Sequence, residues 1–405
     1  MTERLSLGCV NFTGRNQSVG VIVQRCRSAT TSASVGAEGD LLSYAPQNLR
    51  LADLHARKLT PDDGGRMNRT ELESIARAMV AKGKGILAAD ESSGTIKKRF
   101  DSIQLESTEE ARRTYREMLF TTPDAAKYIS GVILYDETLR QKTKDGTPFS
   151  QYLTKLGIIP GIKVDAGAKP LAGFPNETIT EGLDGLRERL AEYHKLGARF
   201  AKWRAVIDIA KDIPTQFAID ANAHALARYG ALCQEAGIVP IIEPEVLMDG
   251  DNSIERCEEV TSAVLESVFE QLNSHRIHLE GMILKPNMVI SGKKNTSRAG
   301  RQQVAEATVR TLKRYVPSAV PGIAFLSGGQ SAAEASEHLS LMNKLGNLPW
   351  ELTFSYGRAL QDEALKAWGG KPEQFAAGQK AFGRRAKLNG DARNGTYTAA
   401  SEQAA

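Results

Sequence analysis

The 405-residue chain is 41% hydrophobic and 25% charged, a composition typical of a globular protein with a sizeable core. Its formal net charge of +4 is small and its charges are interspersed, which argues against nucleic-acid binding. No apolar segment has the length of a membrane span, and four cysteines and six histidines are too scattered for a disulfide framework or a metal centre.

Residues 1–66 differ from the rest and are predicted to be a disordered extension without chemistry. They show no sustained periodicity, and the first 35 residues hold four arginines against the single acid Glu3. This bias is consistent with a transit peptide, which would direct the protein to a plastid or mitochondrion. The alternative is a start assigned upstream of the working start at Met67 in a cytoplasmic protein. Residues 41–58 favour this alternative, because they lose the acid-poor bias.

From Met67 onward, short apolar runs alternate with segments of helical periodicity. The eight runs are residues 85–90, 129–136, 158–165, 198–206, 238–246, 280–290, 322–329 and 351–358. Helix signals between them include a capping box at 107–110 and helical stretches over 179–196, 214–237 and 253–272. This alternation predicts a (β/α)8 barrel, an α/β fold, over residues 67–388.

An open doubly wound sheet is the alternative arrangement of such strands and helices. No GxGxxG follows the first run, and polar residues end nearly every run instead of gathering at one switch point, so the barrel is favoured. The last segment, residues 389–405, is small and polar and is predicted to be a flexible tail.

Polar residues stand at the ends of most predicted strands, where barrel enzymes place their active sites. These residues are Asp90, Lys163, Lys202, Arg204, Glu243, Glu245, Lys285, Ser327, Gly328, Gly329, Gly357 and Arg358. A structural salt bridge would explain any single pair, and a helix N-cap would explain Asp90. Charged residues at five strand ends together indicate chemistry.

Lys285 interrupts a short apolar run, and burial disfavours the charged form of a lysine. Near a second cation such as Lys202, a buried lysine becomes a nucleophile toward carbonyl groups. Imine formation also needs an acid that helps water leave, a role predicted for Glu243 with Glu245 beside it. Asp90 is a second carboxylate, able to exchange a proton with a substrate hydroxyl.

Two glycine-containing turns are predicted to bind phosphate. Ser327-Gly328-Gly329 follows the seventh strand and Gly357-Arg358 the eighth, where barrels often hold this group. An ordinary glycine turn is the alternative for the first of them. Further cations for a second phosphate at the opposite side of the barrel mouth are Arg99, Lys163 and Arg204.

Six segments in this order resemble class I fructose-bisphosphate aldolase: GILAADES at 85–92, FAKWR at 200–204, PIIEPEVL at 240–247, LKPNMV at 284–289, FLSGGQ at 325–330 and LTFSYGRAL at 352–360. The resemblance covers about residues 68–389. It implies reversible cleavage of fructose 1,6-bisphosphate to dihydroxyacetone phosphate and glyceraldehyde 3-phosphate, without metal or other cofactor, by a homotetramer.

The resemblance also implies a role for each candidate residue. Lys285 matches the family's Schiff-base lysine, Glu243 its carbinolamine acid and base, and Lys202 the cation that assists. Asp90 matches the carboxylate of carbon–carbon cleavage, and Glu245 the neighbouring acid. Positions of the ketose-side phosphate site fall on Ser327, Gly328 and Arg358, and cationic positions near the other end fall on Arg99, Lys163 and Arg204.

The C-terminus departs from the pattern of many eukaryotic relatives, which end in a tyrosine. Here Tyr397 is the only tyrosine nearby, which resembles bacterial members and leaves a catalytic role for the tail open. Three alternatives remain: a lysine-dependent aldolase for fructose 1-phosphate or a tagatose bisphosphate, a binding protein without catalysis, and a zinc-dependent aldolase, which the scattered histidines disfavour.

Overall fold

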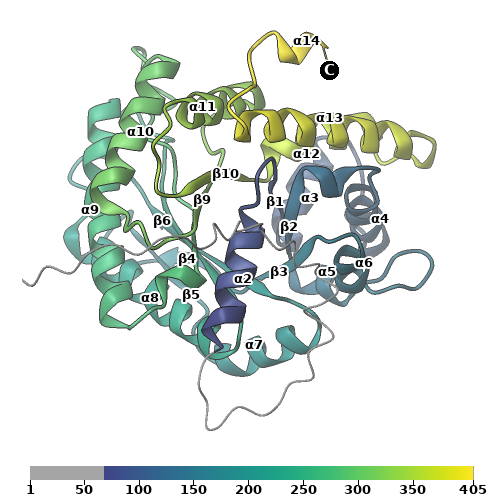
Figure 1. Cartoon of the computed structure of the whole chain (residues 1–405), viewed down its shortest axis with the longest axis horizontal. Coiled ribbons are helices and arrows are strands. Elements are labelled where there is room, and N and C mark those ends of the chain that lie inside the picture. The colour runs from purple at the N-terminus through teal and green to yellow at the C-terminus, as the bar shows by residue number, and fades with distance from the viewer. Residues whose placement is uncertain (1–67, 405) are drawn as a thin grey trace, which may run out of the picture. The chain divides into compact units, whose positions relative to one another are not determined.

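Eight of the ten strands within residues 68–404, the part of the chain that the computed structural model describes, form a closed parallel barrel (Figure 1). β1 pairs with β2 on one side and with β10 on the other, which closes the ring. The barrel strands are β1 Gly85–Ala89, β2 Ile129–Leu134, β3 Ile159–Lys163, β6 Phe200–Ile207, β7 Val239–Val246, β8 Ile283–Leu284, β9 Gly322–Phe325 and β10 Glu351–Tyr356. All eight predicted strands are confirmed, and the open sheet is excluded.

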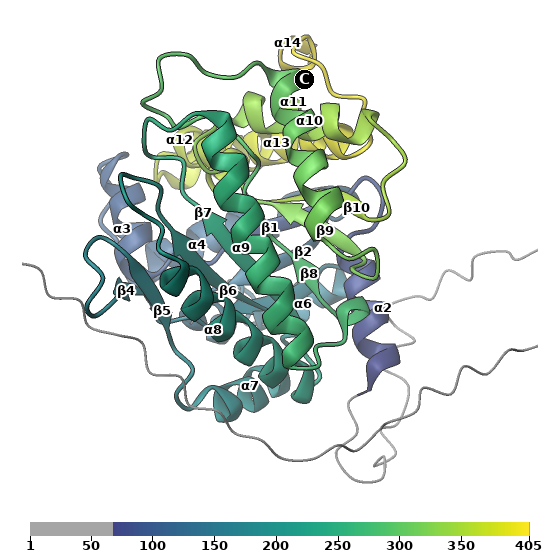
Figure 2. The same cartoon turned by 90° about the vertical axis from the view of Figure 1, so that its left-hand side faces the viewer.

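Helices surround the barrel (Figures 1 and 2). Helix α9 shows the pattern: Ile254, Cys257, Thr261, Val264 and Val268 recur at helical spacing and are buried. The helices are α2 Arg69–Met79, α3 Ser93–Asp101, α4 Glu109–Phe120, α5 Asp136–Arg140, α6 Phe149–Lys155, α7 Leu186–Lys195, α8 Gln216–Glu235, α9 Ile254–Ser274, α10 Arg301–Tyr315, α11 Ala332–Lys344, α12 Arg358–Trp368, α13 Phe375–Arg393 and α14 Ser401–Ala404. Short 3-10 helices span Ala125–Lys127, Leu279–Gly281 and Pro372–Gln374. Within residues 68–404, no helix has the length and apolar content needed to cross a bilayer.

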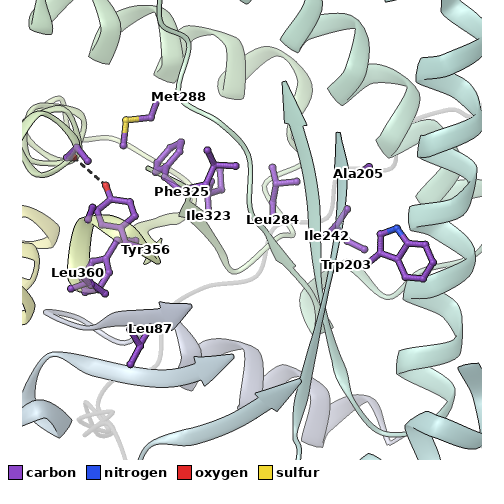
Figure 3. Packing of buried hydrophobic residues seen from close by; sticks show 14 of the residues in the cluster. Leu87, Trp203, Ala205, Ile242, Leu284, Met288, Ile323, Phe325, Tyr356 and Leu360 are labelled. Atoms are coloured by element: carbon purple, nitrogen blue, oxygen red, sulfur yellow. Dashed lines mark hydrogen bonds between the residues drawn. The ribbon is translucent and has the colours of Figure 1, made fainter. Parts of the chain in front are cut away.

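Alternate residues of the strands build two apolar layers. The outer layer lies between strands and helices and contains Trp203, Ile242, Leu284 and Phe325 (Figure 3). Tyr356 belongs to this layer, and its hydroxyl donates to the carbonyl of Ala335 at 3.1 Å. Because side chains alternate along a strand, the residues between these point to the other face of the sheet.

The inner layer fills the amino-terminal end of the barrel. Its strand residues include Phe200, Ile241 and Ile283, and they pack with Leu72 and Met79 of α2. The carbonyl of Met79 accepts a hydrogen bond from Ser130 Oγ, at the start of β2, at 2.5 Å. Helix α2 therefore closes this end, and the polar strand ends lie at the opposite end of the barrel.

An antiparallel hairpin of β4 (Gly167–Pro170) and β5 (Thr178–Glu181) follows β3. The predicted helix over 179–196 was therefore wrong in its first part, because α7 begins only at Leu186. The β-branched residues Thr178, Ile179 and Thr180 favour extended backbone, and Gly185 has a left-handed φ of 63° directly before the helix.

Two further boundaries needed correction. Thr108 caps α4 by accepting from Ala111 N at 3.1 Å, so the capping box predicted at 107–110 was one residue out of register. Helix α13 continues to Arg393, so the tail predicted from residue 389 begins later. The fully buried Asn389 accepts from Ser336 Oγ of α11 at 2.9 Å, a tertiary contact that small polar residues do not reveal.

The C-terminal segment beyond α13 contacts α11 and α13 at two residues: Tyr397 O accepts from Ser340 Oγ at 2.9 Å, and Glu402 Oε2 lies 3.1 Å from Arg384. Tyr397 is buried, and its hydroxyl donates to Glu402 Oε1 at 2.8 Å. Predictions for residues 1–66 lie outside the described residues.

Candidate active site

A buried lysine–glutamate pair lies at the carboxyl end of the barrel. Lys285 directly follows β8, and its backbone N–H donates to Ile242 O of β7 at 2.8 Å. Lys285 Nζ lies 3.0 Å from Glu243 Oε1, and each side chain is only 4% exposed. The parallel register places Ile242 beside Leu284, so the residues that follow them on the two strands are brought together.

Lys202 of β6 is surrounded by carboxylates. Its Nζ lies 2.8 Å from Asp90 Oδ2, 3.4 Å from Glu243 Oε2 and 3.9 Å from Asp165 Oδ2. Asp90 follows β1. Lys202 therefore contacts both Asp90 and Glu243 and links the two carboxylates. The Ncap of α3 is Ser92, so Asp90 is not the helix cap considered from the sequence. Its contact with Lys202 instead favours a role in the site.

The pKa shifts follow from these charges. Burial alone would raise the pKa of Asp90, but Lys202 and Lys285 outweigh it and lower this pKa to about 2. Burial likewise opposes ionisation of Glu243, whose pKa is nevertheless lowered by Lys202 and Lys285. Burial opposes the charge on Lys202 too, but Asp90 and Glu243 raise its pKa above the ordinary value. Lys202 therefore remains a cation at neutral pH, and both acids remain carboxylates.

The turn after Lys285 is fixed by Asn287. Its Oδ1 accepts from Val246 N at the end of β7 at 3.0 Å, and its Nδ2 donates to Thr261 Oγ1 of α9 at 3.1 Å. Pro286 O accepts from Leu326 N, after β9, at 3.2 Å. These bonds hold the Lys285 segment against the strands on both sides.

The two predicted glycine turns meet at one pocket. It has a volume of about 340 Å³, and its lining includes Ser327, Gly329 and Arg358. Gly329 has a left-handed φ of 75°, and a side chain there would collide with Met248. Gly328 lies against Glu245, since a Cβ on it would be 3.2 Å from Glu245 Oε1. The pocket therefore adjoins the end of β7. Gly357 is the Ncap of α12, the helix that begins with Arg358.

Lys163 and Arg204 share a partner that the sequence analysis missed. Lys163 Nζ lies 3.1 Å from Asp165 Oδ1, and Arg204 N donates to Asp165 Oδ2 at 3.4 Å. The guanidinium of Arg204 bonds Glu245. The signal for Asp165 was its position two residues after Lys163 at the end of the predicted strand, on the same face.

Arg99 belongs to a different set of contacts from Lys163 and Arg204. Its guanidinium pairs with Glu91, donates to Gln361 Oε1 at 3.0 Å and lies 3.0 Å from Asp362 Oδ1. Glu91 also binds Arg116 at 2.7 Å. Arg99 is therefore held against α12, the helix that carries Arg358, and the sequence did not indicate Glu91, Gln361 or Arg116.

Gln361 connects α12 with the strand that leads to Asp90. It is fully buried, donates to Ala88 O at 2.6 Å and accepts from Tyr115 OH at 2.9 Å. The backbone on the amino side of Asp90 is thus bonded to the helix that begins at the pocket lined by Ser327 and Arg358.

Comparisons with known proteins agree with one another. The family model for "Fructose-bisphosphate aldolase class-I" matches residues 71–405. A "Probable fructose-bisphosphate aldolase class 1" of Xanthomonas campestris is 59% identical over 332 residues, which cover 82% of this chain and 99% of that protein. The "Fructose-bisphosphate aldolase 4, cytosolic" of Arabidopsis thaliana is 54% identical over 81% of this chain and 84% of its own length.

A solved structure shares the fold. Fructose-bisphosphate aldolase from Plasmodium falciparum, in complex with TRAP and a small-molecule inhibitor, superposes with a TM-score of 0.80 at 51% identity. The match covers 82% of this chain and 96% of that one. At this identity and coverage, the likeness extends to the family as well as the fold.

Proposed function

This chain belongs to the class I fructose-bisphosphate aldolase family, and from that premise we propose which of its residues carry the reaction. The enzyme is a lyase that needs no metal and cleaves fructose 1,6-bisphosphate reversibly to dihydroxyacetone phosphate and glyceraldehyde 3-phosphate in glycolysis. The observation that supports the assignment best is the buried contact of 3.0 Å between Lys285 Nζ and Glu243 Oε1.

Lys285 is the nucleophile. Lys202 is committed as a cation to three carboxylates, whereas Lys285 has one partner at salt-bridge distance among the described residues, Glu243. When the Lys285 ammonium passes a proton to Glu243, the free amine attacks the substrate carbonyl and forms a carbinolamine. Protonated Glu243 then returns its proton to the carbinolamine hydroxyl, which leaves as water.

Asp90 takes the proton that starts carbon–carbon cleavage. With a pKa of about 2 it is a carboxylate at neutral pH, ready to accept the proton of the substrate hydroxyl beside the bond that breaks. The electron pair of that bond moves into the imine and leaves an enamine on Lys285. Lys202, 2.8 Å from Asp90, stabilises the carboxylate before transfer and any negative charge that develops on the substrate oxygens. Glu245, tied to Arg204, is proposed as the neighbouring acid.

The two phosphates are assigned to opposite sides of the barrel mouth. Ser327, Gly328, Gly329, Gly357 and Arg358 hold the ketose-side phosphate, in the pocket where the first turns of α11 and α12 meet. Lys163 and Arg204 are proposed for the other phosphate. Arg99 remains a proposed phosphate ligand, and its contact with Asp362, which lines the pocket, favours the ketose side.

The test is borohydride reduction in the presence of dihydroxyacetone phosphate, followed by peptide mass mapping. We expect a substrate-derived mass on the peptide that contains Lys285. In Lys285→Met, both the adduct and the cleavage of fructose 1,6-bisphosphate should disappear, with a loss of about 10⁴-fold or more in kcat because the nucleophile is gone. Lys380→Met, at an exposed position of α13, is the matched control and should retain both. An unmodified Lys285 in folded, active protein would refute the assignment.

We also propose a homotetramer in the cytoplasm. The homotetramer is an expectation for the family, and one of the relatives is described as cytosolic. Analytical ultracentrifugation measures the first property. Mass spectrometry of the native N-terminus tests the second, because removal of a leader within residues 1–66 would indicate an organelle.

A further inference from the structure

The phosphate pocket contains a second basic side chain besides Arg358. Lys293, in the loop between β8 and α10, lies in the lining together with Arg358, Asp362 and Glu363. Both acids are already paired with arginines outside the lining: Asp362 lies 3.0 Å from Arg99, and Glu363 lies 3.0 Å from Arg384. Within residues 68–404, Arg358 makes no ion pair. The guanidinium of Arg358 is therefore available to an anion in the pocket, and Lys293 is a second cation at its edge.

The loop that carries Lys293 is fixed in place by its backbone. Lys293 N donates to Met248 O at 2.8 Å, and Gly292 N donates to Asn252 O at 2.9 Å. Gly292 lies so close to Gly250 that a Cβ on it would collide with that backbone. Met248 is also the residue that packs against Gly329 of the pocket. The position of Lys293 beside the pocket is thus set by the backbone and does not depend on the lysine side chain.

The Lys293 side chain forms an exposed ion pair that another anion can replace. Its Nζ lies 2.6 Å from Asp249 Oδ1, and these side chains are 42% and 58% exposed. Asp249 is not part of the pocket lining. An exposed ion pair of this kind contributes little free energy, so a dianionic phosphate, with more charge and more acceptor oxygens, can displace the carboxylate.

We propose that Lys293 is a further substrate-binding residue, which releases Asp249 and closes over the ketose-side phosphate opposite Arg358. This inference rests on the phosphate site proposed above. Lys293 acts on binding and is remote from bond making, so its contribution is the same in the ground state and the transition state. Removing such a contact raises KM and leaves kcat unchanged.

The experiment compares Lys293→Met, Asp249→Asn and Lys294→Met on fructose 1,6-bisphosphate and fructose 1-phosphate, which retains only the ketose-side phosphate. Lys294 is the matched control, because it is the next residue, is exposed and is not in the pocket lining. We expect Lys293→Met to raise KM about tenfold for both substrates, the loss of one charge-assisted hydrogen bond. Asp249→Asn should leave KM unchanged or lower it, since it frees the lysine, and Lys294→Met should match the wild type.

Three results would overturn the inference. In one, Lys293→Met has the wild-type KM. In another, Asp249→Asn raises KM as much as Lys293→Met does, which would make the pair a structural contact of the loop. In the third, Lys293→Met affects only fructose 1,6-bisphosphate, which would place Lys293 at the other phosphate.

Failure of this inference is distinguishable from failure of the proposed function. Borohydride labelling of Lys285 in the wild type tests the function alone. Calorimetric titration with inorganic phosphate tests Lys293 alone, and Lys293→Met should weaken phosphate binding whether or not Lys285 is labelled. Equal phosphate affinity in the variant and the wild type would contradict the inference.

Discussion

The two ends of the barrel are built from the same strands but have opposite character. On β7, Val239 and Ile241 belong to the inner apolar layer, whereas Glu243, two residues further along the same face, lies 3.0 Å from Lys285. On β6 the inward residue changes from Phe200 to Lys202 over the same distance. One end is closed by α2, and the other carries the buried charges of Lys202, Glu243 and Lys285.

This difference shows how the fold makes buried charge tolerable. Moving a single lysine or carboxylate out of water into the barrel would cost free energy. The opposite charge on a neighbouring strand offsets this cost and stabilises the buried ion. The apolar end beneath excludes water and fixes the strand register that places those charges. Stability and chemistry should therefore respond to mutations at different ends, and variants at three positions test that separation.

The largest effect is expected at the charged end. Lys202→Met removes the cation nearest to Asp90 and Glu243, and should lower kcat about 10³-fold because developing charge loses its partner. It should also shift the pH profile. Burial, the largest influence on Asp90, is then opposed by Lys285 and Lys163 without Lys202, so the pKa of Asp90 rises from about 2 and kcat/KM falls on the acid side.

The measurement is kcat/KM against pH for the variant and the wild type. Lys195→Met, an exposed lysine at the end of α7, is the control. In the wild type, the low pKa of Asp90 stabilises the fold above its ordinary value of 3.8, and this contribution is lost as pH falls toward about 2. An acid limb at the same pH in variant and wild type would show that Lys202 does not set the ionisation of Asp90.

A smaller effect, on stability only, is expected at the apolar end. Ile133 is fully buried in the inner layer on β2, a strand that contributes no proposed site residue. Ile133→Ala should cost about 2–5 kcal/mol of unfolding free energy through the cavity it leaves, and Ile133→Val about 1 kcal/mol. Urea denaturation measures both, and kcat of the folded variants should equal that of the wild type. A reduced kcat at full folding would mean that the two ends are coupled.

The smallest effect is expected from the charges at the rim of the apolar end. His278 Nε2 lies 2.9 Å from Glu73 of α2 and its Nδ1 lies 3.1 Å from Glu280, and Glu73 is 31% exposed. Glu73→Gln should change stability by about 1 kcal/mol or less and leave kcat unchanged, because water screens this pair. Thermal denaturation and a rate assay test this. A loss of activity comparable to that of Lys202→Met would remove the distinction between the two ends.

The predicted lysine, glutamate and aspartate of the site stood out because each interrupts or ends an apolar run. Asp165 was passed over because Lys163, two residues earlier, accounted for the same strand end. Gln361 and Glu91 gave no signal at all, since a glutamine within a helix and an acid after Asp90 are ordinary surface residues in a sequence. The role of Gln361 depends on burial against Arg99 and Tyr115, which are distant from it along the chain, and that of Glu91 depends on its buried ion pair with Arg99.

The sequence by itself determined the eight apolar runs, the helices between them and the charged residue types at the strand ends. Side-chain alternation and hydrophobic periodicity are properties of neighbouring residues, so they are readable without a fold. Tertiary structure alone decided that Lys202 takes three carboxylates while Lys285 takes one. It also decided that Arg99 lies against α12, that Tyr397 is bonded to α11, and that Lys293 lines the same pocket as Arg358. Each of these depends on distances between segments that only closure of the barrel brings together.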